Sequence, residues 1–328
     1  AHATALGRIA ARLAAAQENA SIHRNTSSGL LWGCPEADLC STSDGQGLFF
    51  ASGLWAWRGL TDLATVIGGL GVDTLGPMTI DAMRRAALPL LADTLTAAAA
   101  VANRSSGWLP PCLKCSVTRE FYNMTQSRIA SYTNYRFWPE MLSSGGLPAS
   151  IAAGLGRFRQ THGGELLGMT RFESWMDDWP LPNVALWWLD QDPGSTIGSA
   201  SRFSLATLAH LAHHSTRGTF TAFEQANWAD NQADNCVPSQ LVVPMLLTHA
   251  FVHIARPAAS LMVESTLWLH RGLPRNWFAA GFQLSNTSVW SGAPRSLSVS
   301  TAVTVGADGS ARCTLTVHTA HEAGAFSP

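Results

Sequence analysis

Two short stretches gather acidic, aromatic and amide side chains in a chain whose charged residues make up only 13% of the sequence. The first stretch, 163–182, contains the acids and indole rings Glu165, Asp177, Asp178, Trp175 and Trp179. Carboxylates beside aromatic rings bind the hydroxyl groups and the apolar face of a sugar. They also occur at ordinary helix ends, where Asp178 would cap the following helix. The stretch therefore predicts a sugar site, a helix N-terminus, or both.

Glu165 is the acid in this stretch that best suits proton transfer. It follows two glycines and precedes two leucines, and apolar neighbours favour the protonated carboxyl that a general acid needs. A salt bridge to Arg159 or Arg171 is the alternative role. Adjacent aspartates point to different sides of the backbone. If Asp178 caps a helix, Asp177 is left as a base or as a ligand of sugar hydroxyls.

The second stretch surrounds Glu224. Gln225 follows it directly, and Trp228 lies four residues after it. A carboxylate among rings and amides is typical of carbohydrate sites, and this stretch lacks the apolar periodicity of a buried helix. We therefore predict that Glu165 is the general acid and Glu224 the general base in the hydrolysis of a glycosidic bond, with Asp177 as the competing base.

A third stretch offers different chemistry. Tyr135 and Arg136 follow Asn134, and such a trio can neutralise a uronate and move a proton in the elimination reaction of a polysaccharide lyase. The alternative is a helix with inward-facing aromatic side chains. Trp55, further upstream, is expected in the core, with the mouth of a cleft as the alternative. The predicted substrate-binding residues are Trp175, Asp178, Trp179, Trp228, Tyr135, Arg136 and Gln225.

No metal or nucleotide cofactor is predicted. His249 and His253 have the i, i+4 spacing of a helical metal site, but no glutamate follows the first histidine as in a zincin helix. The motif CLKC at 112–115 is half of a zinc site without a second half. The phosphate-binding patterns GxGxxG and GxxxxGKS are absent. We therefore expect no cofactor.

The charge pattern points to a neutral partner. The net charge is −1 and no block of Lys or Arg appears, so the field that holds nucleic acid or an anionic membrane is missing. No apolar run reaches the roughly 18 residues that a membrane span needs. We expect a carbohydrate substrate, no nucleic acid and no membrane insertion, while the oligomeric state stays open.

Sequons and cysteines indicate the secretory pathway. Five asparagines stand in N-x-Ser/Thr, namely Asn19, Asn25, Asn103, Asn123 and Asn286. Among the six cysteines, two close pairs are candidates for local disulfides, Cys34 with Cys40 and Cys112 with Cys115. Cys236 and Cys313 either pair with each other or stay free. We expect a secreted glycoprotein with disulfide bonds.

The elements that must position these residues follow from periodicity. Apolar residues recur with helical spacing up to about 256, and helices are predicted over 1–18, 47–69, 78–103, 125–143, 147–159, 180–190, 201–215 and 238–255. The period then changes to two, and GADGS predicts a hairpin turn. We predict an α domain over 1–256 and a β domain over 257–328. Serial helices without a solenoid consensus favour a toroid of helical hairpins.

The order of several motifs resembles the C-terminal half of six-hairpin glycosidase-like proteins. These motifs are GGELLGMTRF, MDDWP, RGTFTAFEQ, DNCVPSQLVVPMLL and LWLHRGLPRNWF. GELLGMT is similar to the E-x-L-G-W-T element of α-L-rhamnosidase-type toroids, with Glu165 on the motif glutamate. RGTFTAFEQ is similar to their G-x-T-T-x-W-E element, with Glu224 on the glutamate. The resemblance covers about 120–290.

This resemblance implies an (α/α)6 toroid followed by a small antiparallel β-sandwich. It implies a glycosidase, and inverting enzymes hold their two carboxyl groups roughly 6.5–9.5 Å apart. A whole toroid has twelve helices, so the resemblance also implies a fragment that lacks its N-terminal part. Two alternatives remain, a polysaccharide lyase of the α/α toroid type and a non-catalytic carbohydrate-binding protein.

Overall fold

The fold is taken from a computed structural model and is mostly helical, with small antiparallel sheets. The structure describes residues 2–18, 24–34, 46–69, 71–75, 78–114, 132–172, 175–177, 181–191, 199–214, 225–226, 237–255, 266–289, 297–308 and 310–319. The described helices are α1 (His2–Glu18), α2 (Phe50–Gly69), α3 (Ile80–Val101), the π-helix η3 (Thr133–Phe137), α5 (Trp138–Ser143), α6 (Ala149–Thr161), α7 (Leu181–Asp190), α8 (Ser199–His214), α9 (Val237–Phe251) and α10 (Arg275–Ala280).

Helical periodicity located these helices to within a few residues, except for α10, which lies in the segment predicted as β structure. Two further departures are seen. The segment predicted as a helix over 125–143 contains the π-helical turn of η3 within its described part. The helix predicted over 238–255 ends at Phe251, because Val252–Ala255 forms the strand β7 and pairs with β8 (Thr266–Leu269). Pro89 and Pro244 lie inside α3 and α9, and both helices continue past them.

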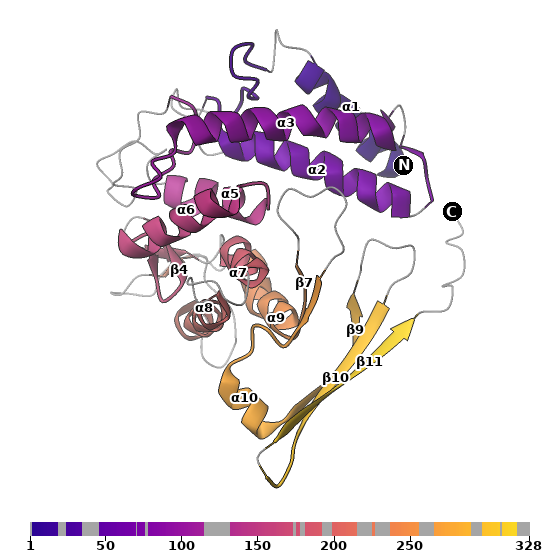
Figure 1. Cartoon of the computed structure of the whole chain (residues 1–328), viewed down its shortest axis with the longest axis vertical. Coiled ribbons are helices and arrows are strands. Elements are labelled where there is room, and N and C mark those ends of the chain that lie inside the picture. Colours follow the sequence, from indigo (N-terminus) through magenta and orange to yellow (C-terminus); the bar gives the residue numbers. More distant parts are fainter. Residues whose placement is uncertain are drawn as a thin grey trace.

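The long helices α2 and α3 form an antiparallel pair joined by the short strands β1 (Thr74–Leu75) and β2 (Met78–Thr79) (Figure 1). The Thr79 hydroxyl accepts a hydrogen bond from the backbone N–H of Ala82 at 3.1 Å, which caps the start of α3. Along α2, Leu54, Trp57 and Leu60 recur on one face and are buried. This pair supplies one wall of the helical body.

Helix α5 links this pair to the helices that follow. Helix α5 contacts both α2 and α7, and α7 also contacts α8 and α9. One hydrophobic cluster runs through all of them and includes the large rings of Trp138, Phe158, Trp187 and Trp188. Figure 1 shows α7, α8 and α9 grouped on the far side of α5 and α6 from α2 and α3. The (α/α)6 toroid itself stays a prediction.

In the described part of the chain, four sheets accompany the helices, and all their pairings are antiparallel. The sheet nearest the predicted site has the order β3 (Glu165–Leu166), β4 (Met169–Phe172), β5 (Trp175–Asp177) and β6 (Gln225–Ala226). The C-terminal sheet contains β9 (Phe282–Val289), β10 (Leu297–Val305) and β11 (Ala311–Thr319), with β10 in the middle. The predicted alternation is confirmed on β10, where Val299, Thr301 and Val303 are buried.

Two loops share the motif N-x-S-S-G and one conformation, a repeat that the sequence analysis missed. In Asn25-Thr26-Ser27-Ser28-Gly29 and in 103–107, the asparagine Oδ1 accepts the backbone N–H groups two and three residues later at 3.0–3.1 Å. Both glycines have positive φ, +70° and +77°. Gly29 packs on Asp93 of α3, and Gly107 packs on Gly154 of α6. Each loop therefore packs through its glycine onto a later helix.

Gly107→Ala is expected to destabilise the protein more than Gly71→Ala, by roughly 1–3 kcal/mol. Both positions have positive φ, +77° and +70°, so both substitutions strain the backbone. A Cβ at Gly107 would lie 2.2 Å from the backbone oxygen of Gly154, whereas nothing lies within 4 Å of a Cβ at Gly71. Urea denaturation of both variants measures the difference, and equal midpoints would show that the loop is not tightly docked.

Candidate functional site

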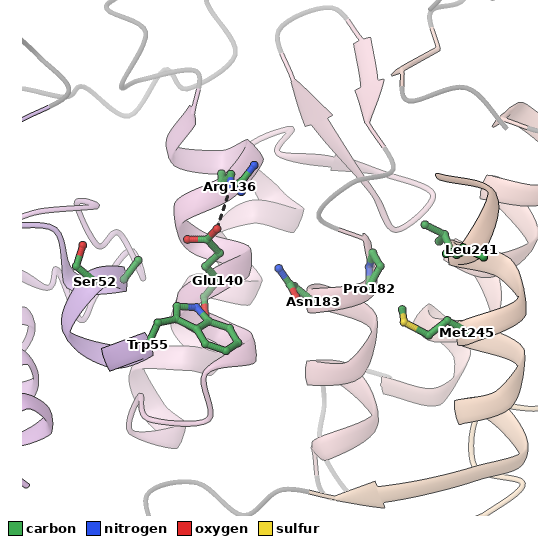
Figure 2. A pocket seen from close by; sticks show the side chains of 10 residues that line it. Ser52, Trp55, Arg136, Glu140, Pro182, Asn183, Leu241 and Met245 are labelled. Carbon is green, nitrogen blue, oxygen red and sulfur yellow. Dashed lines mark hydrogen bonds and ion pairs between the residues drawn. The ribbon is translucent and has the colours of Figure 1, made fainter. Parts of the chain in front are cut away.

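A pocket of about 500 Å³ lies where the N-terminal parts of four helices meet (Figure 2). Its polar and aromatic lining is Ser52 and Trp55 from α2, Arg136 and Glu140 from η3 and α5, and Asn183 from α7. Helix α9 adds the apolar side chains of Leu241 and Met245. These residues are almost 200 positions apart in the chain, so the pocket is a product of the tertiary fold.

Trp55, Arg136 and Glu140 form a connected group on one wall of the pocket. Arg136 Nε donates to Glu140 Oε1 at 2.9 Å, one helical turn away. Trp55 Nε1 donates to the backbone oxygen of Glu140 at 3.1 Å. This hydrogen bond fixes the position of the Trp55 side chain, although the residue is 39% exposed. Figure 2 shows the indole ring beside Glu140, with Asn183 across the opening on α7.

The π-helical turn sends Asn134 and Arg136 in different directions. Asn134 is buried, and its Nδ2 donates to the backbone oxygens of Gly164 and Arg171 at 2.7 and 2.6 Å. Tyr135 is buried beside Phe172, with ring centroids 4.6 Å apart. Of the trio proposed for lyase chemistry, Arg136 alone lines the pocket. Extra residues in π-helices often lie at functional sites, which agrees with the position of this turn.

The two acid-rich stretches come together as strands of one sheet. Glu165 pairs with Thr170, Thr170 with Asp177, and Asp177 with Gln225, in one row across β3 to β6. Residues directly opposite each other point to the same face. Neighbouring strands are about 4.8 Å apart, so Glu165 and Asp177 lie roughly 10 Å apart along the row. Glu224 immediately precedes β6 and lies outside the described residues.

Glu165 takes part in buried ion pairs. Its side chain is 4% exposed and contacts Arg202 and, at 3.8 Å from Oε2, Arg159 Nη1. Arg159 also donates to Asn134 Oδ1 at 3.0 Å and to Thr170 Oγ1 at 2.9 Å. Burial lowers the pKa of Arg159, and the charge of Glu165 acts in the opposite direction. The salt bridge to Arg159, the alternative considered from the sequence, is thus observed.

The other predicted site residues fall into two groups. Asp177 is fully buried and Trp175 is partly buried, both on β5, and neither lines the pocket. Outside the described residues lie Asp178, Trp179, Glu224, Trp228 and the side chain of Gln225. The catalytic roles of Glu165, Asp177 and Glu224 therefore stay predictions.

The cysteines and sequons are described in part. Cys34 and Cys112 are disulfide-bonded, while Cys40, Cys115 and Cys236 lie outside the described residues, so the predicted pairings stay predictions. Cys313 is a free, exposed thiol. Among the sequons, Asn25 and Asn103 lie in the two repeated loops and Asn286 lies in β9. Asn19 and Asn123 lie outside the described residues.

Sequence reasoning did not select Glu140 or Asn183. The i, i+4 spacing of Arg136 and Glu140 was a local signal for an ion pair on a helix surface. Asn183 follows Pro182 in the first turn of α7 and has no comparable signal. Trp55 lines the pocket, which was the alternative to the core considered for it, whereas the nearby Trp57 is buried.

No protein-family model, curated protein or solved structure matches the chain. Within the described residues, no three His, Cys, Asp or Glu side chains are grouped closely enough to hold a metal ion. None of the described helices combines the length and the apolar character that crossing a membrane requires. The site is therefore interpreted from its own geometry.

Proposed function

We propose that the pocket between the four helix starts binds a saccharide and that the protein is a glycoside hydrolase-like protein. The observation that carries this proposal is the group of Trp55, Glu140 and Arg136 beside the pocket opening, with Asn183 across it. An exposed indole face covers the apolar side of a sugar ring. Carboxylate, guanidinium and amide groups supply the donors and acceptors that sugar hydroxyls need.

Elimination chemistry has less support at this site. Asn134 and Tyr135 are buried in contacts with the neighbouring sheet, and Arg136 is already paired with Glu140. A lyase needs a cation free to neutralise a uronate and a base beside it. Hydrolysis by paired carboxylates therefore remains the better proposal.

Hydrolysis requires two carboxyl groups on opposite sides of the glycosidic bond. Glu140 is the acidic side chain among the described residues that line the pocket, and it is our candidate for one of the two. Glu224 stays our prediction for the second from the sequence alone; it lies outside the described residues, and the residue after it pairs with Asp177 in the sheet of β3 to β6. The role of Glu165 as general acid stays a prediction. Its ion pairs with Arg159 and Arg202 also give it a structural role.

Trp55→Ala is expected to weaken saccharide binding at least about ten-fold, because it removes the ring that would stack on the sugar. The binding constant is measured by titration calorimetry with the tightest ligand found in a panel of neutral oligosaccharides. Trp32→Ala is the matched control, since Trp32 is 54% exposed and does not line the pocket. Equal weakening by both variants would argue against this pocket.

Glu140→Gln separates binding from catalysis. This change keeps the size of the side chain and removes its charge. If Glu140 is a catalytic carboxylate, turnover of an aryl glycoside or oligosaccharide is expected to fall by roughly a hundred-fold or more while binding persists. Binding without turnover in the unmodified protein would leave a carbohydrate-binding protein. No binding of any saccharide by either form would contradict the proposal.

A further inference from the structure

A free thiol lies beside a buried histidine in the C-terminal sheet, among residues that do not line the proposed saccharide pocket. Cys313 on β11 is exposed, and its Sγ lies 3.7 Å from Nδ1 of His270. His270 follows β8 and is only 6% exposed. Cys313 therefore has a partner, because Nδ1 of the buried His270 ring is directed at its sulfur.

His270 is held in place on several sides. Its Nε2 lies 2.8 Å from the hydroxyl of Thr301, a buried residue on β10. The ring is packed edge-on against Phe282, with centroids 4.8 Å apart. Its backbone N–H donates to the oxygen of Phe251 at 2.7 Å, and its φ is +58°, which is uncommon for a residue other than glycine. Residues held in such conformations are concentrated at functional sites.

Strand register brings the third group to the same face. Cys313 is opposite Val303, and Leu315 is opposite Thr301. Alternate residues of a strand share a face, so Thr301 and Cys313 both point toward His270. A nucleophile is activated when a base lies beside it and a third group holds the base in position. Here Cys313 is the nucleophile, His270 the base and Thr301 the third group.

The His270 ring is in the neutral form that can accept a proton from a thiol. Burial lowers the pKa of His270, so the ring is neutral near pH 7. We assign its proton to Nε2, which donates to Thr301 Oγ1 and leaves the Nδ1 lone pair facing the thiol of Cys313. In the described part of the chain, Phe251, Phe278 and Phe282 supply the remaining ring contacts of His270, and none of them carries a charge.

We propose that Cys313, His270 and Thr301 form a reactive thiol site that exchanges with small-molecule disulfides. The thiol proton moves from Sγ to His270 Nδ1 as the sulfur attacks one sulfur of the disulfide. The bond between the two sulfurs of the small molecule breaks, and a mixed disulfide forms on Cys313. The departing thiolate takes the proton from Nδ1, so one thiol is consumed and one is released with no other oxidant.

The test is the rate at which Cys313 reacts with an aromatic disulfide reagent at pH 7. The rate is measured by the absorbance of the released thiolate, and any other thiol is corrected for with Cys313→Ser. His270→Asn is expected to slow the reaction about ten-fold or more, since it removes the base. Asparagine is chosen because it tolerates positive φ. Thr301→Val is expected to slow the reaction less, because it only frees the orientation of the ring.

A cysteine on the opposite face of the same strand is the matched control. Thr316 is exposed and lies an odd number of residues from Cys313, so it faces away from His270. In the Cys313→Ser background, Thr316→Cys is expected to react as slowly as Cys313 does in the His270→Asn variant. Equal rates for native Cys313 and the control thiol would overturn the proposal. If His270→Asn does not fold, this comparison still decides the question.

Discussion

Replacing Glu165 by alanine is expected to lower the free energy of unfolding by roughly 3–5 kcal/mol. Glu165 is the carboxylate that contacts Arg159, whose own side chain is 1% exposed. Without Glu165 the Arg159 guanidinium would be buried beside Arg202, and no other carboxylate of the described residues contacts it. Its hydrogen bonds to Asn134 and Thr170 would remain. An uncompensated buried charge is far more costly than the loss of a surface ion pair. Urea denaturation at pH 7 gives the value directly.

Two variants show whether burial is the cause. Arg202→Ala removes the partner that is 31% exposed and leaves the contact with Arg159 intact, so its cost is expected to be well below that of Glu165→Ala. Glu140→Ala, which removes a carboxylate at the edge of the pocket, is expected to cost about 1 kcal/mol or less. If Glu165→Ala were as stable as the unmodified protein, the structural task of Glu165 would be refuted.

The second large effect is a loss of stability in acid that comes from His210. This residue on α8 is buried, and burial lowers its pKa from 6.5 to about 4. Between these two values the unfolded chain binds a proton that the folded chain does not. The free energy of unfolding therefore falls as the pH drops through 6.5 toward 4, by at most roughly 3 kcal/mol from this residue. The lowered pKa of His270 acts in the same direction.

The acid effect is measured by urea denaturation at pH 7.5, 6, 5 and 4. In His210→Leu the side chain cannot titrate, so the slope of stability against pH between 6.5 and 4 is expected to be shallower. The comparison uses slopes and not absolute stabilities, because the substitution can also change packing at pH 7.5. Identical slopes in both proteins would mean that folding does not lower the pKa of His210.

Local patterns predicted the elements well because they act within one turn or one strand. Helical spacing located α2 and α3, and period-two alternation located β10 and β11. The ends were less predictable where two patterns compete. Val252 and Ile254 alternate like a strand and pair with β8, although they follow a long apolar helix. Neither helical spacing nor period-two alternation could predict the π-helical turn in η3.

The candidate site was predictable only in part because its members come from distant segments. The sequence identified the acid-rich stretches, and the structure places the row of Glu165 and Asp177 beside Gln225. It also selected Arg136, which lines the pocket. The sequence could not show that α2, α5, α7 and α9 begin around one pocket, because helix packing decides which helix ends meet.

The repeated N-x-S-S-G loops show the opposite case, a local signal that was present and missed. Asn25 and Asn103 were considered as sequons alone. Their side-chain oxygens hold the two turns, and each loop docks on a later helix through its glycine. Searching at repeat lengths typical of solenoids could not find two loops that are 78 residues apart.

The most direct test of the central claim is a crystal structure of the protein soaked with the tightest-binding oligosaccharide. The proposal predicts a sugar ring stacked on Trp55, with hydroxyl groups within hydrogen-bond distance of Glu140, Arg136 or Asn183. A sugar bound elsewhere, with this pocket empty at saturating ligand, would contradict the claim that the four helix starts enclose the functional site.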